Sequence, residues 1–180
     1  MDFKKSKTWS NLLIAFSKES EAHTKYLYYA SKAKKEGLNI ISSIFEETAK
    51  NEKEHAKIWF KKMHDDDIPI TLENLKDAIK GENYEWNEMY SEFSKIAEEE
   101  GYHEISKLFK LVGEVESHHS KRFNDLLNSL TNNQVFNSEE PVLWICTNCG
   151  HLHVGKTPPL ICPVCKHPQS YFARENRVYN

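Results

Sequence analysis

A four-residue pattern, Glu-x-x-His, occurs twice in the chain, at residues 52–55 and 116–119. The two copies lie 64 residues apart, and their surroundings repeat at the same offset: Tyr26 with Tyr90, Gly37 with Gly101, Phe45 with Phe109, and Lys57 with Lys121. Residues three apart lie on one face of a helix, so each copy directs a carboxylate and an imidazole to the same side. The repeat therefore predicts a duplicated helical hairpin with an inward-facing polar pair in each half.

Apolar residues spaced by three and four predict long helices on both sides of the repeat. The expected helices cover residues 8–36, 39–64, 82–100 and 103–130, and Gly37 and Gly101 are expected to end the first and third. A further short helix is expected over residues 71–80, capped by Thr71 and stopped by Gly81, within the crossover that joins the hairpins. The fold class is thus mainly α, with a helical domain over residues 1–135.

The inward faces of these helices carry an unusual number of charged groups. The carboxylates are Glu19, Glu52, Glu82, Glu85 and Glu116, and the imidazoles are His55 and His119. Any one of them alone could sit at the edge of a core with its polar end in water. An unpaired buried carboxylate costs several kcal/mol, so five together would rival a domain's whole stability of roughly 5–15 kcal/mol. We therefore predict a dinuclear metal site of the kind built in the core of ferritin-like bundles, for iron or manganese and less selectively for zinc.

Other polar residues near this site carry weaker signals. His23 follows Glu19 by one turn and is expected to be a surface or satisfied core histidine. Tyr26 and Tyr90 occupy equivalent places, where each either hydrogen-bonds a ligand carboxylate or packs in the core. Glu88 and His118 are expected to face outward.

Residues 131–140 are polar and lack periodicity, so they are expected to form a linker to a second small domain at residues 141–180. All four cysteines fall there, as two Cys-x-x-Cys pairs: Cys146 with Cys149, and Cys162 with Cys165. Two such pairs strongly indicate one tetrahedral metal site. The spacing alone leaves iron and zinc open, and a structural zinc ribbon is the commoner occupant.

Charge and hydropathy exclude several broad classes. The net charge is −3 and no basic block occurs, which argues against nucleic-acid binding. No apolar run is long enough to span a membrane, and residues 1–10 lack the apolar core of a signal peptide. We therefore expect a cytoplasmic protein.

Together these motifs resemble the rubrerythrins over nearly the whole chain. The resemblance rests on Glu52-x-x-His55-Ala56-Lys57, Glu82-x-x-Glu85, Glu116-x-x-His119 and the Cys-Pro-x-Cys-x-His-Pro run at residues 162–168. It implies a ferritin-like di-iron bundle followed by a rubredoxin-like domain that holds one iron in four thiolates, with zinc possible in either site. It also implies that all seven bundle residues are ligands, and that Glu85 and His55 are alternate ligands of one iron.

The resemblance further implies a peroxidase that reduces hydrogen peroxide to water and protects against oxidative stress. Its electrons would come from an external donor such as rubredoxin and its reductase, and the working unit would be a head-to-tail homodimer. A ferritin-like protein that oxidises and sequesters iron is the alternative, and a zinc-loaded interaction module is a third. The chain departs from the family in two places: His151 stands where tyrosine is more usual, and the crossover between the hairpins is short.

Overall fold

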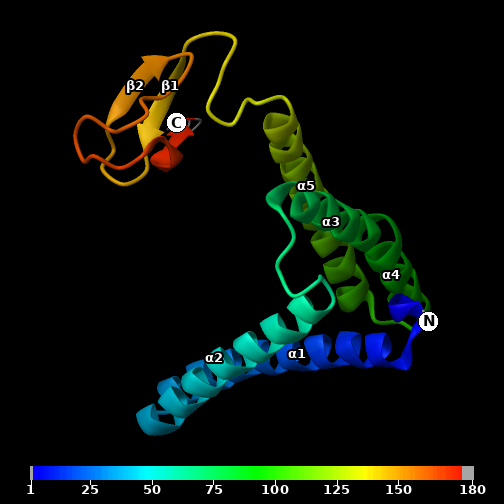
Figure 1. Cartoon of the computed structure of the whole chain (residues 1–180). Coiled ribbons are helices and arrows are strands. Elements are labelled where there is room, and N and C mark those ends of the chain that lie inside the picture. Colours follow the sequence, from blue (N-terminus) through cyan, green and yellow to red (C-terminus); the bar gives the residue numbers. More distant parts are fainter. Residues whose placement is uncertain (1, 176–180) are drawn as a thin grey trace. The chain divides into compact units, whose positions relative to one another are not determined.

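The computed structural model describes residues 2–175 and divides the chain into two compact units, residues 1–70 and 71–180. The first unit contains a short 3-10 turn, η1 (Phe3–Lys5), and an antiparallel helical hairpin made of α1 (Lys7–Lys35) and α2 (Asn39–Lys62). The second unit begins with a long helical segment, α3 (Thr71–Tyr84), η2 (Glu85–Met89) and α4 (Tyr90–Glu99), which pairs with α5 (His103–Thr131) (Figure 1). No helix in the described part is both long and apolar enough to cross a membrane.

Both hairpins turn in the same way, as the repeat predicts. Gly37 and Gly101 follow their helices with φ of +77° and +84°, a conformation that glycine adopts without strain. The next N–H, of Leu38 or Tyr102, donates to the carbonyl oxygen five residues earlier, at 2.9 and 2.8 Å. These are the hydrogen bonds of a Schellman cap, so both glycines end helices as predicted.

Residues 71–80 are helical as predicted, but the predicted end at Gly81 and the place of this helix in the crossover are wrong. Gly81 does not stop a helix, because it lies inside α3, which runs on to Tyr84 and continues through η2 into α4. Residues 71–80 are therefore the first turns of the second hairpin and pack against α5. A lone glycine lowers helix stability by about 1 kcal/mol relative to alanine, which the helix–helix contacts can offset.

The hairpins bury only small side chains between their helices. In the first unit the buried residues are Ala30, Ala33, Ser42, Ala49 and Ala56, and in the second hairpin they are Ser94, Ala97, Ser106, Gly113 and Ser120. No large apolar side chain of α1–α5 is fully buried within the described residues. Close helix packing explains the small residues, and it leaves the larger apolar groups of each hairpin without a complete core.

The tail is a small antiparallel sheet with its own core. Its strands are β1 (Val142–Cys146), β2 (Leu152–Gly155) and β3 (Phe172–Arg174), in the order β2-β1-β3, and a 3-10 turn, η3 (Gln169–Tyr171), precedes β3. Trp144 and Phe172 are buried with two of the cysteines, and Trp144 Nε1 donates to the Gly155 carbonyl at 2.9 Å. The preceding linker is tied to this sheet, because the Arg174 guanidinium donates to the carbonyls of Gln134 and Asn137 at 3.0 and 2.6 Å.

Candidate metal centres

The first helical unit gathers three of the predicted ligands. Glu19 comes from α1, and Glu52 and His55 come from successive turns of α2. His55 Nδ1 lies 3.0 Å from Glu52 Oε2 and 3.7 Å from Glu19 Oε2, and one donor atom from each residue falls within 4.8 Å of the others. A hydrogen bond with Glu52 is the largest cause that raises the pKa of Glu19, and the same bond lowers the pKa of Glu52. The two carboxylates thus lie close enough for a proton between them to be favoured over two adjacent negative charges, and a cation would have the same effect.

The second helical unit repeats this arrangement. Glu82 comes from α3, and Glu116 and His119 come from α5. His119 Nδ1 lies 2.7 Å from Glu116 Oε2 and 3.5 Å from Glu82 Oε2, and the donor atoms again fall within 4.8 Å. Burial is the main cause that raises the pKa of Glu82, followed by its hydrogen bond with Glu116.

The Glu82 carboxylate provides a test of whether a metal fits. Its Oε2 is buried and accepts no hydrogen bond from the described residues. His119 Nδ1 contacts this oxygen at 3.5 Å without a hydrogen bond. A buried acceptor without a hydrogen bond costs about 1–3 kcal/mol, so a group that binds this oxygen would remove a penalty. Oxygen and imidazole donors without a thiolate suit iron, manganese or zinc, so the residues present fit the predicted metals.

A π-helical turn distinguishes the second hairpin from the first. Glu19 and Tyr26 are seven residues apart, whereas Glu82 and Tyr90 are eight residues apart, and the extra residue falls where η2 (Glu85–Met89) forms a π-helix. π-turns commonly mark a one-residue insertion in a helix and often occur at functional sites. The predicted extra ligand, Glu85, opens this turn. The difference in spacing was visible in the sequence and could have predicted the turn.

Glu85 is half-buried and its charge contributes to the raised pKa of Glu82, whereas Glu88 is exposed. Burial is the largest cause that raises the pKa of Tyr90, and the Glu85 and Glu116 charges add to it. The Tyr90 phenol therefore lies near the carboxylates and stays protonated at neutral pH. Its ring also packs against Phe109, at 5.9 Å between centroids, which is the core role considered for it, and its hydrogen bond to a ligand carboxylate stays a prediction.

Three other residues that the sequence singled out lie outside the two clusters. His23 is a satisfied histidine, because its Nδ1 lies 2.7 Å from the Ala49 carbonyl oxygen. The Tyr26 ring packs against Phe45, at 6.0 Å between centroids, and its hydroxyl forms no hydrogen bond with a carboxylate of the described residues. His118 is exposed, as expected.

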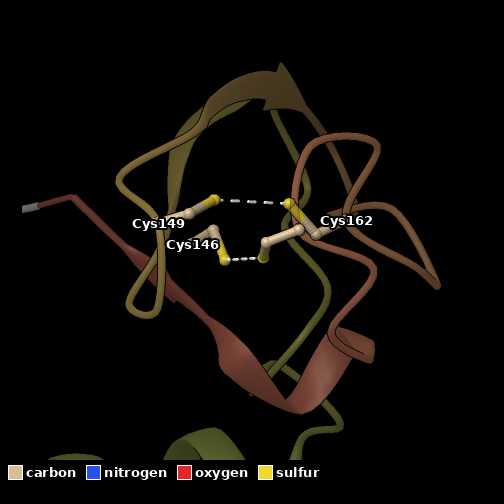
Figure 2. A group of neighbouring side chains, drawn as sticks. Cys146, Cys149 and Cys162 are labelled. Atoms are coloured by element: carbon tan, nitrogen blue, oxygen red, sulfur yellow. Dashed lines mark hydrogen bonds between the residues drawn. The ribbon is translucent and has the colours of Figure 1, made fainter.

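The four cysteines of the tail form one compact cluster (Figure 2). Cys146 Sγ lies 3.7 Å from Cys165 Sγ, and Cys149 Sγ lies 3.7 Å from Cys162 Sγ. A disulfide would require about 2.05 Å. Four sulfurs placed about 2.3 Å from one tetrahedral metal stand about 3.8 Å apart, so the observed spacing fits a four-thiolate site.

Two similar turns hold these cysteines. In each, the first cysteine's N–H donates to a histidine carbonyl oxygen: Cys146 to His151, and Cys162 to His167, at 2.9 and 2.8 Å. The first turn places Gly150 at φ +77°, and the second places Lys166 at φ +61°. The sequence indicated the glycine but not the lysine, which adopts this less common conformation without a glycine signal.

Backbone N–H groups also act on the sulfurs. The His167 N–H lowers the pKa of Cys165 to about 5. The His151 N–H favours the Cys149 thiolate, but burial and the neighbouring thiols outweigh it and raise the pKa of Cys149 to about 12. Four crowded thiols therefore cannot all ionise unless a cation is bound among them.

Two helical hairpins with carboxylate–histidine clusters and a four-cysteine knuckle define a non-haem metalloprotein of ferritin-like type with a rubredoxin-like tail. Comparisons with known proteins agree. The rubrerythrin family model matches residues 10–127, and a model described as the rubredoxin-like domain of rubrerythrin matches residues 144–173.

Individual relatives match over almost their full length. Rubrerythrin-1 of Clostridium acetobutylicum is 45% identical over 184 residues, covering 94% of this chain and 94% of the relative. The rubrerythrins of Porphyromonas gingivalis and Nitratidesulfovibrio vulgaris are 42% and 41% identical; both alignments cover 94% of this chain, and they cover 90% and 94% of the relatives. The chain belongs to the rubrerythrin family.

Proposed function

We propose that this protein is a non-haem di-iron peroxidase that reduces hydrogen peroxide to two waters, with two electrons and two protons. The observation that carries the proposal is the presence of two kinds of metal site in one chain. The two carboxylate–histidine clusters suit a pair of irons, and the four-cysteine cluster suits a single iron that transfers electrons. When bound, the iron pair would supply both electrons to peroxide, and the thiolate-bound iron would return them one at a time.

In this proposal the helices hold and position the reacting centre. Glu52 and Glu116, one from each cluster, would hold the metals together with the histidine one turn later on each helix, His55 or His119. Glu85 and His55 take the role of alternate ligands of one metal, as the family implies. Tyr90 remains protonated beside Glu85 and Glu116 and keeps a hydrogen-bond donor available there.

The four-cysteine tail distinguishes this function from iron storage. Storage by iron oxidation needs a carboxylate site but no electron relay within the chain, and a zinc-loaded interaction module needs no carboxylate site. Iron uptake well beyond three atoms per chain would indicate storage. A protein that stays colourless after anaerobic iron reconstitution would indicate the zinc module, because thiolate-bound ferric iron is coloured.

The decisive experiment compares two oxidants. The reduced protein, mixed rapidly with hydrogen peroxide or with dioxygen, should be oxidised much faster by the peroxide. Equal rates would contradict the proposal.

A substitution at Glu85 tests the proposed extra ligand. Glu85→Ala should still bind two bundle metals but lose peroxide turnover. Glu88→Ala, at an exposed position, is the matched control and should change little.

We also propose that the working unit is a homodimer in which electrons pass between chains, from an external donor such as rubredoxin. α5 continues twelve residues beyond His119, roughly 18 Å, before the linker begins. A tail carried that far can serve the metal site of a neighbouring chain. The test combines two inactive variants in heterodimers. Cys146→Ser has a defective tail and an intact second-unit cluster, whereas Glu116→Ala has an intact tail and a defective cluster. Restored turnover supports the relay, and no restoration in proven heterodimers contradicts it.

A further inference from the structure

Three residues of the second hairpin, Asn83, Trp86 and Ser120, share one hydrogen-bond node, called the Asn83 node below. The side-chain oxygen of Asn83, Oδ1, accepts from the Ser120 hydroxyl at 2.7 Å and from the Trp86 indole N–H at 3.1 Å. An indole N–H can only donate, so the amide oxygen of Asn83 must face it. The node therefore joins α3, η2 and α5 at a single atom.

Each member of the Asn83 node directly follows a predicted metal ligand in the sequence. The three pairs of neighbours are Glu82–Asn83, Glu85–Trp86 and His119–Ser120. Successive residues of a helix point about 100° apart, so the node lies beside the ligand face of the hairpin and not on it. Each ligand shares a planar peptide unit with its neighbour in the node. A bond that holds the node therefore restrains the backbone of three ligands at once.

The node also spans the point where the π-turn begins. α3 ends at Tyr84, η2 begins at Glu85, and the bond from Trp86 to Asn83 crosses this boundary. The Trp86 side chain is 39% exposed, so the bond holds a ring that water would otherwise leave free to turn. Ser120 is only 5% exposed, and its bond is therefore protected from competition by water. The π-turn is thus fastened to α3 at its start and, through Asn83, to α5.

The described part of the first unit, residues 2–70, contains no such node, although the two hairpins are repeats of each other. Ala56 occupies the position equivalent to Ser120 and has no hydroxyl to donate. Ser20, which is equivalent to Asn83, donates to the Phe16 carbonyl of its own helix at 2.7 Å. The node thus accompanies the π-turn as a feature of the second hairpin.

A hydrogen bond near the hairpin turn provides a comparison for a role in packing alone. The hydroxyls of Ser94 and Ser106 lie 3.0 Å apart and join α4 to α5, and the equivalent Ser42 of α2 donates across to α1 at 2.9 Å. A bond between helices at this place therefore occurs in both hairpins. Ser106 stands 14 residues before Ser120, roughly 21 Å along α5. The Asn83 node differs in both respects, because it belongs to one hairpin and lies next to the ligands.

We infer that Asn83, Trp86 and Ser120 are positioning residues that set how tightly the second-unit cluster binds metal. Their node holds the backbone of the three preceding ligands in one arrangement, so less of the site has to be ordered when a cation binds. Glu85 then exchanges as a ligand by rotation of its side chain, while its backbone stays in place. This inference rests on the proposed function, because it concerns the metal site of that function.

A cobalt titration of the folded protein tests the effect on affinity. The four-cysteine site is first filled with zinc, and cobalt(II) is then added to the bundle sites and followed by its visible absorption. Ser120→Ala removes one donor of the node, and Trp86→Phe removes the other but keeps an aromatic ring. Each should weaken one of the two bundle cobalt ions roughly tenfold, since partners that orient ligands typically contribute 10–100-fold to metal affinity. Ser120→Thr, which keeps the hydroxyl, should restore the affinity.

Ser106→Ala is the matched control, because it also removes a buried hydroxyl from α5. It should lower the urea midpoint about as much as Ser120→Ala but leave cobalt affinity unchanged. Equal losses of affinity in these two variants would show that the node acts through stability alone and would overturn the inference. Unchanged affinity in both Ser120→Ala and Trp86→Phe would overturn it as well. Absence of bundle cobalt and iron in the wild-type protein would instead contradict the proposed function.

Hydrogen exchange of the metal-free protein gives a result that needs no metal. Amides of residues 83–90 should exchange about 2- to 10-fold faster in Ser120→Ala and Trp86→Phe than in the wild type, the factor expected for loss of one hydrogen bond. Amides of residues 94–106 should not change in these variants, whereas Ser106→Ala should give the reverse pattern. Unchanged exchange over residues 83–90, or equally faster exchange over both stretches, would show that the node does not restrain the ligand backbone.

Discussion

Gly113 and Gly81 offer a comparison in which the same substitution should have different effects. Both lie inside helices, Gly81 in α3 and Gly113 in α5. A Cβ added at Gly81 meets nothing within 4 Å, whereas a Cβ added at Gly113 lies 3.3 Å from Tyr90 Cβ. Because that atom is fixed to the backbone where η2 meets α4, it cannot rotate away. Gly113 therefore permits the close approach of the helix that carries the π-turn.

The magnitudes follow from these contacts. Gly81→Ala should stabilise the protein by about 1 kcal/mol through helix propensity alone. Gly113→Ala gains the same amount, but overpacking costs about 1–3 kcal/mol, so the net effect should range from about zero to a loss of about 2 kcal/mol. The first hairpin supplies a control at the equivalent position, because Ala49 is fully buried there. Ala49→Gly should be destabilising by roughly 1 kcal/mol or more.

Urea unfolding, followed by helical circular dichroism, measures all three variants against the wild type. The midpoint should rise for Gly81→Ala and should stay or fall for Gly113→Ala. If Gly113→Ala stabilised the protein as much as Gly81→Ala, the close approach of Tyr90 would carry no energetic weight, and our account of this glycine would be refuted.

Three further predictions concern the metal sites and the tail. Burial is the largest cause that raises the pKa of Glu82 above its ordinary 4.5, so the folded metal-free protein binds this proton more tightly than the unfolded chain. The stability that this proton contributes should be full below about pH 4.5 and should be lost as the pH rises through the raised pKa of Glu82. Unfolding midpoints measured against pH should show this loss without metal and should not show it with saturating metal. In metal-free protein at pH 6–7, Cys165, with a pKa of about 5, should be alkylated well before Cys149, which is more exposed but has a pKa of about 12. Mass spectrometry measures the order of labelling, and faster labelling of Cys149 would contradict the prediction. Trp144→Phe removes the indole N–H that donates to the Gly155 carbonyl and should cost about 1 kcal/mol in thermal unfolding of the tail. An unchanged midpoint would show that this hydrogen bond contributes nothing.

Much of this molecule was predictable because its sequence carries strong local signals. The duplicated Glu-x-x-His pattern and the glycines at 37 and 101 predicted both hairpins and their turns, since helix faces and left-handed caps depend on nearby residues. The two Cys-x-x-Cys pairs predicted the four-sulfur cluster for the same reason. These signals act within a few residues, so tertiary contacts do not override them.

Other features depended on contacts that the sequence does not display directly. Gly81 indicated a helix end, but packing of α3 against α5 carries the helix through it. The π-turn at η2 was indicated only by the spacing from Glu82 to Tyr90, which is one residue longer than that from Glu19 to Tyr26. Lys166 adopts a positive φ because the cysteine turn requires it there, and Arg174 fastens the expected linker to the sheet through carbonyl groups. None of these roles could be predicted from the residue type alone.

The single extra residue at η2 has a consequence for symmetry. Duplication by itself would give two metal positions with the same ligands and the same affinity. The two clusters offer the same donors, two carboxylates and one imidazole each, but with Glu85 as the further ligand that we propose, the second half would offer a third carboxylate. The two positions therefore differ in formal charge, and a divalent cation should enter the more negative one first. If Glu85 binds metal as proposed, we expect stepwise loading with a distinguishable singly occupied form.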